Sequence, residues 1–174
     1  MKFKLQNVRL SFPSLFATEQ YGGEDTGKYA ATFILDKNDH KEVVAAMQSH
    51  IGELQKTLKG GSKIAADKVA LKDGDLSGRD ELTGKMVVKA TTKKRPLVLN
   101  RDKSPIVEQD NIIYAGCYVN AIITFWLQDN QYGKRVNASL SGVQFSKDGQ
   151  SFGDVVTVDE FDDLSEFSTD EPPF

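Results

Sequence analysis

At 174 residues, with 39% hydrophobic residues, the chain is long enough for one domain with a sizeable core plus appendages. No apolar run reaches the roughly 18 residues that a membrane-spanning helix needs, and no N-terminal signal peptide is evident. The single cysteine excludes an internal disulfide and a multi-cysteine zinc site, which favours a reducing cytoplasm.

The charges are divided unevenly along the chain. All 22 Lys and Arg residues lie in residues 1–153, together with 17 of the 25 acidic residues. Residues 154–174 hold the other eight acidic residues and no Lys or Arg. A short segment this acidic cannot bury its charges, so it is expected to form a disordered tail. The basic remainder suggests a protein that handles a polyanion.

Residues 1–35 predict two strands separated by a loop. Charged and apolar residues alternate from Lys2 to Gln6, the pattern of a half-buried strand, which Phe12-Pro13 should end. The polar residues 18–27 include Gly22-Gly23 and predict a loop. Residues 28–35 predict a second strand, whose apolar face is formed by Tyr29, Ala31, Phe33 and Leu35.

One helix is predicted, ending near residue 58. Asn38 or Asp39 is the candidate N-cap, with Glu42 placed as the return partner of a capping box from Asp39. Five apolar residues fall on one stripe: Val43, Met47, Ile51, Leu54 and Leu58. Residues 62–85 are rich in Gly, Asp and Lys, and predict an extended or loop insertion.

Three further strands are predicted, at residues 85–93, 112–128 and 135–145. In the first, Met86, Val88 and Ala90 face one way and lysines the other. In the last, Gly142 marks a bulge, because the apolar phase shifts after it. Several strands with turn breaks and one inserted helix indicate a mainly β chain, either a small barrel or a sandwich.

The two faces of the strand predicted at residues 112–128 differ in chemistry. Its odd positions are apolar, and several are small, which is typical of a barrel interior. Its even positions carry Tyr114, Tyr118 and Trp126 beside polar groups. Arg135 and Asn137 share the corresponding face of the next strand.

Aromatic rings among basic and amide side chains suit single-stranded nucleic acid. Every base offers a flat face for stacking, and Lys and Arg neutralise phosphates. Lys89, Lys93 and Arg95 are predicted to extend the same DNA-binding surface. The alternative is that the aromatic residues pack beneath the predicted helix or a loop.

No catalytic or metal-binding pattern stands out. The sequence holds no Ser-His-Asp arrangement, Walker motif or Gly-rich phosphate loop, so no enzyme is expected. Residues 73–78 copy the opening of a calcium loop, but Gly84 stands where a bidentate Glu is required. Neither a metal nor a cofactor is therefore expected.

The stretch Ile113-Tyr114-Ala115-Gly116-Cys117-Tyr118-Val119-Asn120-Ala121 resembles a bacteriophage protein family first catalogued as a domain of unknown function. The similarity also covers residues 8–13, 73–75, 129–134 and 143–145, and so most of residues 1–153. Studied members are single-stranded DNA-binding proteins. The resemblance implies an oligonucleotide/oligosaccharide-binding (OB) fold, a five-stranded Greek-key barrel, over residues 1–153.

The tail separately resembles the acidic, Phe-terminated ends of bacterial and phage single-stranded DNA-binding proteins. The matching end consists of Asp170, Glu171, Pro173 and Phe174. A terminal carboxylate beside a phenyl ring is a compact signal for a basic-rimmed apolar pocket. Residues 154–174 are therefore predicted to dock phage or host replication and recombination proteins. The long low-complexity linker of the bacterial proteins is missing from this sequence.

The sequence thus predicts a protein that coats single-stranded DNA during phage replication or recombination, in the cytoplasm of the infected bacterium. One rival is a strand-annealing or recombination-mediator protein with the same DNA surface. Another is an adaptor whose aromatic face binds protein. No membrane association is expected, and homo-oligomer formation is left open.

Overall fold

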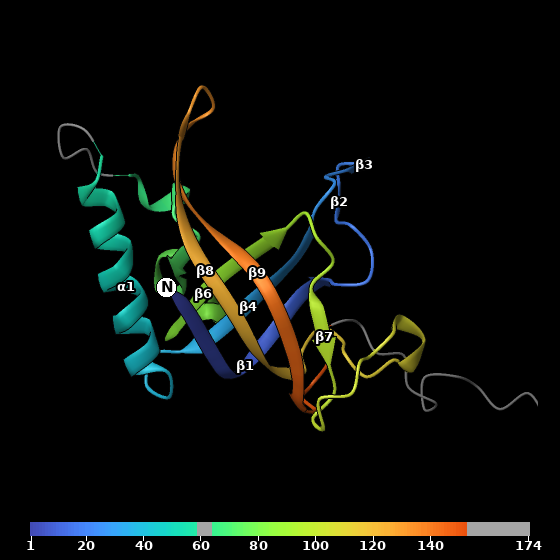
Figure 1. The fold of residues 1–174 in the computed structure, drawn as a ribbon. Helices are drawn as coiled ribbons and strands as arrows, with labels where there is room; N and C mark the ends of the chain where they lie inside the picture. The colour runs from blue at the N-terminus through green and yellow to red at the C-terminus, as the bar shows by residue number, and fades with distance from the viewer. Residues whose placement is uncertain (59–63, 153–174) are drawn as a thin grey trace, which may run out of the picture.

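The computed structural model describes residues 1–58 and 64–152 (Figure 1), so the predicted disordered tail lies outside the described residues. The elements in chain order are β1 (Lys2–Ser14), β2 (Gln20–Tyr21), β3 (Glu24–Asp25), β4 (Tyr29–Asp36), α1 (Lys41–Lys56), β5 (Leu71–Asp73), β6 (Lys85–Thr92), β7 (Leu97–Leu99), β8 (Tyr118–Asn130) and β9 (Gly133–Lys147). Short 3₁₀ turns lie between some of them, including η2 (Ala66–Lys68) and η4 (Asp80–Leu82). No helix in these two ranges is long and apolar enough to cross a membrane.

Five strands close a barrel, with α1 at its side (Figure 1). β1 pairs antiparallel with β4 and β8, β4 pairs with β6, and β8 pairs with β9. The ring closes where β6 runs parallel to β9, at Thr91 and Ser139. The predicted mainly β chain, with a five-stranded barrel and one inserted helix, is confirmed.

The predicted inward faces are also confirmed. Alternate residues of each barrel strand fill the interior, as expected when one face of a strand is buried. Buried residues include Phe33 and Leu35 of β4, Met86 and Val88 of β6, Val119, Ala121, Ile123 and Phe125 of β8, and Val136, Ala138 and Leu140 of β9. The polar and aromatic outward residues are therefore left on the barrel surface.

β1 does not end at Phe12-Pro13 as predicted. Instead the strand continues to Ser14 and absorbs two irregularities in its register. Asn7 and Phe12 take positive φ values of 54° and 46° at these points. Such bulges bend a strand, and here the first half of β1 pairs with β8 while the second half pairs with β4.

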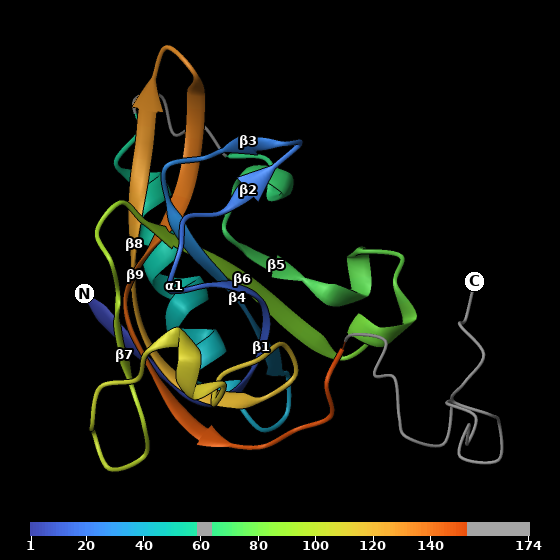
Figure 2. The same cartoon turned by 90° about the vertical axis from the view of Figure 1, so that its right-hand side faces the viewer.

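The longest predicted strand begins later than expected. β8 starts at Tyr118 instead of residue 112, and Gly116 just before it has a φ of 109°. β8 and β9 form a hairpin that extends beyond the rest of the barrel (Figure 1 and Figure 2). The predicted bulge at Gly142 is confirmed, because the register shifts between Ile122 and Ile123, opposite Gly142.

Short elements and the helix cap differ from the prediction. The predicted loop at residues 18–27 contains the two-residue strands β2 and β3, and β5 and β7 were not predicted. Neither Asn38 nor Asp39 caps α1: His40 is the N-cap, without a side-chain capping bond. The backbone N–H groups of Asn38 and Asp39 instead donate to Asp36. The predicted apolar stripe does pack inward, with Met47 and Ile51 buried.

Candidate nucleic-acid interface

A groove of about 510 Å³ lies on the outer surface of the barrel, between the β8–β9 hairpin, β4, β6 and the segment around η2. Four of the predicted DNA-binding residues line it: Trp126, Arg135, Asn137 and Lys89. Lys28, Lys68 and Lys72 add further cations. We call this hollow the Trp126 groove.

Strand alternation explains why Trp126 faces outward. Its neighbour Phe125 is buried in the barrel, so the indole must point to the opposite side, where it is 44% exposed. Asn137 lies directly across from it on β9, and Arg135 lies across from Gln128. Cross-strand partners stand about 5 Å apart at Cβ and diagonal neighbours about 7–8 Å, so the Asn137 amide lies directly across from the ring and Arg135 lies diagonal to it.

A chain of amides fixes the orientation of Asn137. The backbone N–H of Tyr132 donates to Asn130 Oδ1 at 2.9 Å, so the oxygen of that amide is identified. Gln128 Nε2 donates to the same oxygen at 3.4 Å, and Asn137 Nδ2 donates to Gln128 Oε1 at 2.8 Å. Asn137 Oδ1 accepts no hydrogen bond from a described residue, which leaves an acceptor beside the Trp126 ring.

The cations of the groove are mostly available. Lys28, Lys72 and Arg135 form no ion pair within the described parts of the chain, whereas Lys89 pairs with Glu19 at 3.0 Å. An exposed pair of this kind contributes only about 0–1 kcal/mol, so a phosphate can compete for the ammonium. The groove therefore combines an exposed indole, a free amide oxygen and several positive charges.

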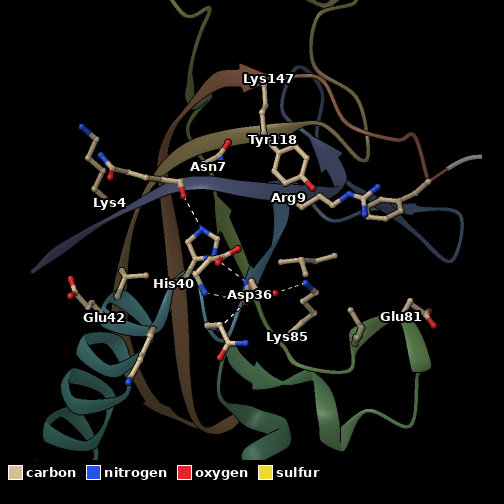
Figure 3. Close-up of a pocket in the computed structure, with 18 residues that line it drawn as sticks. Lys4, Asn7, Arg9, Asp36, His40, Glu42, Glu81, Lys85, Tyr118 and Lys147 are labelled. Atoms are coloured by element: carbon tan, nitrogen blue, oxygen red, sulfur yellow. Dashed lines mark hydrogen bonds and ion pairs between the residues drawn. The ribbon is translucent and has the colours of Figure 1, made fainter.

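A second, larger hollow of about 800 Å³ contains Tyr118 (Figure 3). Lys4 and Arg9 of β1 and Lys147 at the end of β9 lie near it, and Asp36 and Lys85 form part of its lining. We call it the Tyr118 cavity. The structure thus separates Tyr118 from Trp126 and places each ring in its own hollow.

Cations cover the ring of Tyr118. Lys147 Nζ lies 4.8 Å from its centroid and Arg9 Cζ lies 6.0 Å away. Arg9 also stacks on Phe152 at 4.1 Å and donates to the carbonyls of Gly116 and Gln150. An exposed cation–π contact contributes about 0.5–1 kcal/mol, less than the roughly 1–3 kcal/mol of base stacking. A base can therefore displace the flexible Lys147 from the ring.

Tyr114 does not share a strand with Tyr118 and Trp126, and that prediction is wrong. It precedes β8 and is half-buried, with its oxygen 2.9 Å from Asp148 Oδ1 and 3.0 Å from the Gly149 carbonyl. The same oxygen accepts the N–H of Gly149 at 3.0 Å. Burial raises the pKa of the Tyr114 phenol, which keeps the O–H protonated and able to donate.

The remaining predicted residues lie elsewhere. Lys93 and Arg95 follow β6 and are exposed, but neither lines the Trp126 groove or the Tyr118 cavity. Asp170, Glu171, Pro173 and Phe174 lie outside the described residues. In the calcium-like loop, Lys37 Nζ bonds Asp73 Oδ1 at 2.7 Å and Asp75 Oδ2 at 2.5 Å. These bonds lower the pKa of both carboxyls.

Several surface residues were missed from the sequence. Arg9 alternates with buried Val8 and Leu10, so the period of β1 could have placed it outward. Lys72 belongs to the unpredicted β5, and Lys68 to η2. Lys147 lies across from Tyr118 on the β8–β9 hairpin, but beyond the predicted end of its strand at residue 145. Phe152 reaches the Tyr118 cavity only through the tertiary fold, which no local signal reveals.

Comparisons with known proteins agree with this geometry. The family model described as the ssDNA-binding protein of Enterobacter phage Enc34 matches residues 1–171. The chain is 42% identical over 180 residues to putative protein p50 of Acyrthosiphon pisum secondary endosymbiont phage 1, covering 95% of each chain.

Solved structures give the same result. The single-stranded DNA-binding protein from bacteriophage Enc34 in complex with ssDNA is 37% identical, with a TM-score of 0.77 over 87% of this chain and 89% of that one. The single-stranded DNA-binding protein gp2.5 of bacteriophage T7, at 12% identity and a TM-score of 0.50, shares the fold over 90% of this chain and 97% of that one. This chain belongs to the Enterobacter phage Enc34 ssDNA-binding protein family.

Proposed function

We propose that this chain coats and protects single-stranded DNA in phage replication or recombination, without sequence specificity and without catalysis. The observation that carries the proposal is the Trp126 groove, where an exposed indole lies among cations, most of which form no ion pair with another described residue. The family relative solved with ssDNA supports it. Its place of action would be the cytoplasm of the infected host.

The binding mode follows from the chemistry of the groove. A base stacks on Trp126, and Arg135, Lys89 and Lys72 neutralise phosphates on either side of it. Asn137 offers its free Oδ1 to an amino or imino group on the stacked base. Because every base has a π-face and a donor on its edge, this arrangement tolerates all sequences. Lys93 and Arg95 would extend the phosphate contacts beyond the groove.

The acidic tail, residues 154–174, is proposed to bind partner proteins. Asp170, Glu171, Pro173 and Phe174 would dock replication or recombination proteins of the phage or host through charge and a terminal phenyl ring. This part of the proposal rests on sequence alone. A pull-down with the full chain and with a Phe174→Ser variant tests whether the terminal ring is needed.

The DNA proposal is tested with Trp126, which is the only tryptophan of the chain. Its fluorescence should be quenched as a short single-stranded oligonucleotide is titrated at two salt concentrations, with a duplex of the same length for comparison. Trp126→Ala should weaken binding of a labelled oligonucleotide about 5- to 150-fold, the equivalent of one lost stacking contact.

Tyr132→Ala is the matched control, since Tyr132 is 79% exposed at the hairpin tip but does not line the groove. The control should bind like the unchanged protein. Unchanged affinity of the Trp126 variant would instead favour the protein adaptor. Faster pairing of complementary strands in an annealing assay would assign the strand-annealing role.

A further inference from the structure

The two hollows lie on one face of the same sheet. The outward residues of the paired strands β4 and β6 form three successive rungs: Thr32–Lys89, Ile34–Val87 and Asp36–Lys85. The first rung lies in the Trp126 groove and the third in the Tyr118 cavity. The middle rung is divided between them, because Val87 lines the groove and Ile34 lines the cavity. The two hollows therefore adjoin across this apolar rung.

The Tyr118 cavity has one cationic side. Lys4, Arg9 and Lys147 gather along β1 and the end of β9, and none of them is ion-paired within the described residues. Glu42 of α1 and Glu81 of η4 lie on the opposite side (Figure 3). Between them, Lys85 Nζ and Asp36 Oδ2 form an ion pair at 2.8 Å. Arg79 pairs with Glu81 at 2.8 Å, and Lys41 of α1 lines the cavity beside Glu42. The unpaired positive charge is therefore concentrated on the β1 side, which is the side that attracts a polyanion.

The cationic side also carries two aromatic rings. Tyr118 lies there beneath Lys147, and Phe152 is 46% exposed with Arg9 stacked on it. Aromatic rings interleaved with cations are the chemistry that tracks single-stranded nucleic acid. The Trp126 groove, at the other end of the same sheet face, has the same composition.

We propose that the Tyr118 cavity is a second binding site for the same DNA strand. The strand leaves Trp126, crosses the Ile34–Val87 rung and reaches Tyr118 and Phe152, with its phosphates along Lys4, Arg9 and Lys147. The inference rests on the proposed function and defines the length of DNA that one protein covers. Trp126 and Tyr118 are eight residues apart on β8, which corresponds to about 26 Å along a strand.

This path makes the effect of mutations depend on oligonucleotide length. Lengths from about 4 to about 16 nucleotides cover the range of site sizes of such barrels. The double variant Lys4→Gln/Lys147→Gln should leave the affinity for the shortest oligonucleotide unchanged. For the longest one it should weaken binding and reduce the slope of log K against log salt by about 1.4, or about 0.7 per lost phosphate contact.

Two comparisons separate a local contact from a general loss of charge. Lys56→Gln/Lys103→Gln removes the same charge from residues that line neither hollow, and should change binding little at any length. Arg135→Gln in the Trp126 groove should lower the affinity for short and long oligonucleotides alike. Tyr118→Ala should lower the affinity for long oligonucleotides only, and Tyr118→Phe should retain it.

The outcomes distinguish this inference from the proposed function. The second-site proposal is overturned if Lys4→Gln/Lys147→Gln weakens the binding of oligonucleotides of all lengths equally, or of none. It is also overturned if this double variant binds like the Lys56→Gln/Lys103→Gln control. If the unchanged protein binds no single-stranded oligonucleotide of any length, the proposed function itself fails. Thermal unfolding of each variant shows that the barrel is intact.

Discussion

Single side chains hold the end of the described chain in place. Tyr114 bonds Asp148 and Gly149, while Arg9 bonds the carbonyls of Gly116 and Gln150. The N–H of Phe152 also donates to the carbonyl of Ala115 at 3.1 Å. Residues 148–152 thus lie against the segment before β8 without forming a strand. These contacts are polar and specific, so they depend on individual hydroxyl and guanidinium groups.

Tyr114→Phe tests this arrangement at the scale of one atom. The change removes the oxygen that accepts from the Gly149 N–H and bonds Asp148, and it should cost about 1–2 kcal/mol of unfolding free energy. Denaturant unfolding measures the loss. Tyr132→Phe is the control, because that hydroxyl is at the exposed hairpin tip. An equal effect of the two variants would contradict a structural role for the Tyr114 hydroxyl.

At the scale of elements, the alternation of apolar and polar residues predicted the positions of the long strands well. It predicted poorly the residues at which those strands begin and end. β4, β6, β8 and β9 each bury one face, so a period of two residues reveals which side chains point outward. Residues 112–117 carry one buried side chain, Cys117, and partly buried apolar ones, but their backbone bonds Leu10 through a turn at Gly116. The sequence pattern does not distinguish an apolar residue on the inner face of a strand from one packed inward by such a turn.

The candidate site was predicted in part for the same reason. Trp126, Arg135 and Asn137 belong to one hairpin, so local alternation brings them together. Lys28, Lys72 and Arg9 join the surface through pairings between strands far apart in the sequence. Such pairings depend on the closed barrel, which the sequence pattern indicated only as one of two architectures.

Two glycines make the role of local geometry testable. Gly52 lies within α1 with open space around its Cα, so Gly52→Ala should stabilise the protein by about 0.5–1 kcal/mol. Gly116 has a φ of 109°, and a Cβ there would meet the Gln150 carbonyl oxygen at 2.1 Å. Gly116→Ala should therefore destabilise by more than about 1 kcal/mol.

Thermal unfolding distinguishes the two changes, since about 1 kcal/mol corresponds to a shift of roughly 2–4 °C in a protein of this size. Opposite signs of the shift are expected. A Gly116→Ala protein as stable as the unchanged chain would mean that residues 148–152 do not need the close approach to Gly116.

At the scale of the whole molecule, the uneven charge sets up a competition. Residues 1–153 are basic and hold both hollows, whereas residues 154–174 carry eight negative charges. A covalently attached polyanion raises the local concentration of negative charge near the proposed DNA path. The acidic tail and DNA would then compete for the same lysines and arginines.

Deletion of residues 159–174 should accordingly strengthen single-stranded DNA binding at low salt. The gain should shrink as salt increases, because screening weakens the competition. Fluorescence titration of both proteins at two ionic strengths measures it. A tail of unchanged length with its Asp and Glu replaced by Asn and Gln should behave like the deletion. Equal or weaker affinity of the truncated protein would contradict the competition.

The parallel contact between β6 and β9 has a consequence for how the protein is made. β9 is the last strand of the barrel, and it supplies the partner for both β8 and β6. A growing polypeptide therefore cannot complete the ring until Lys147 has been synthesised and has emerged from the ribosome. Until then, the edges of β6 and β8 await their partner, exposed to unintended pairing.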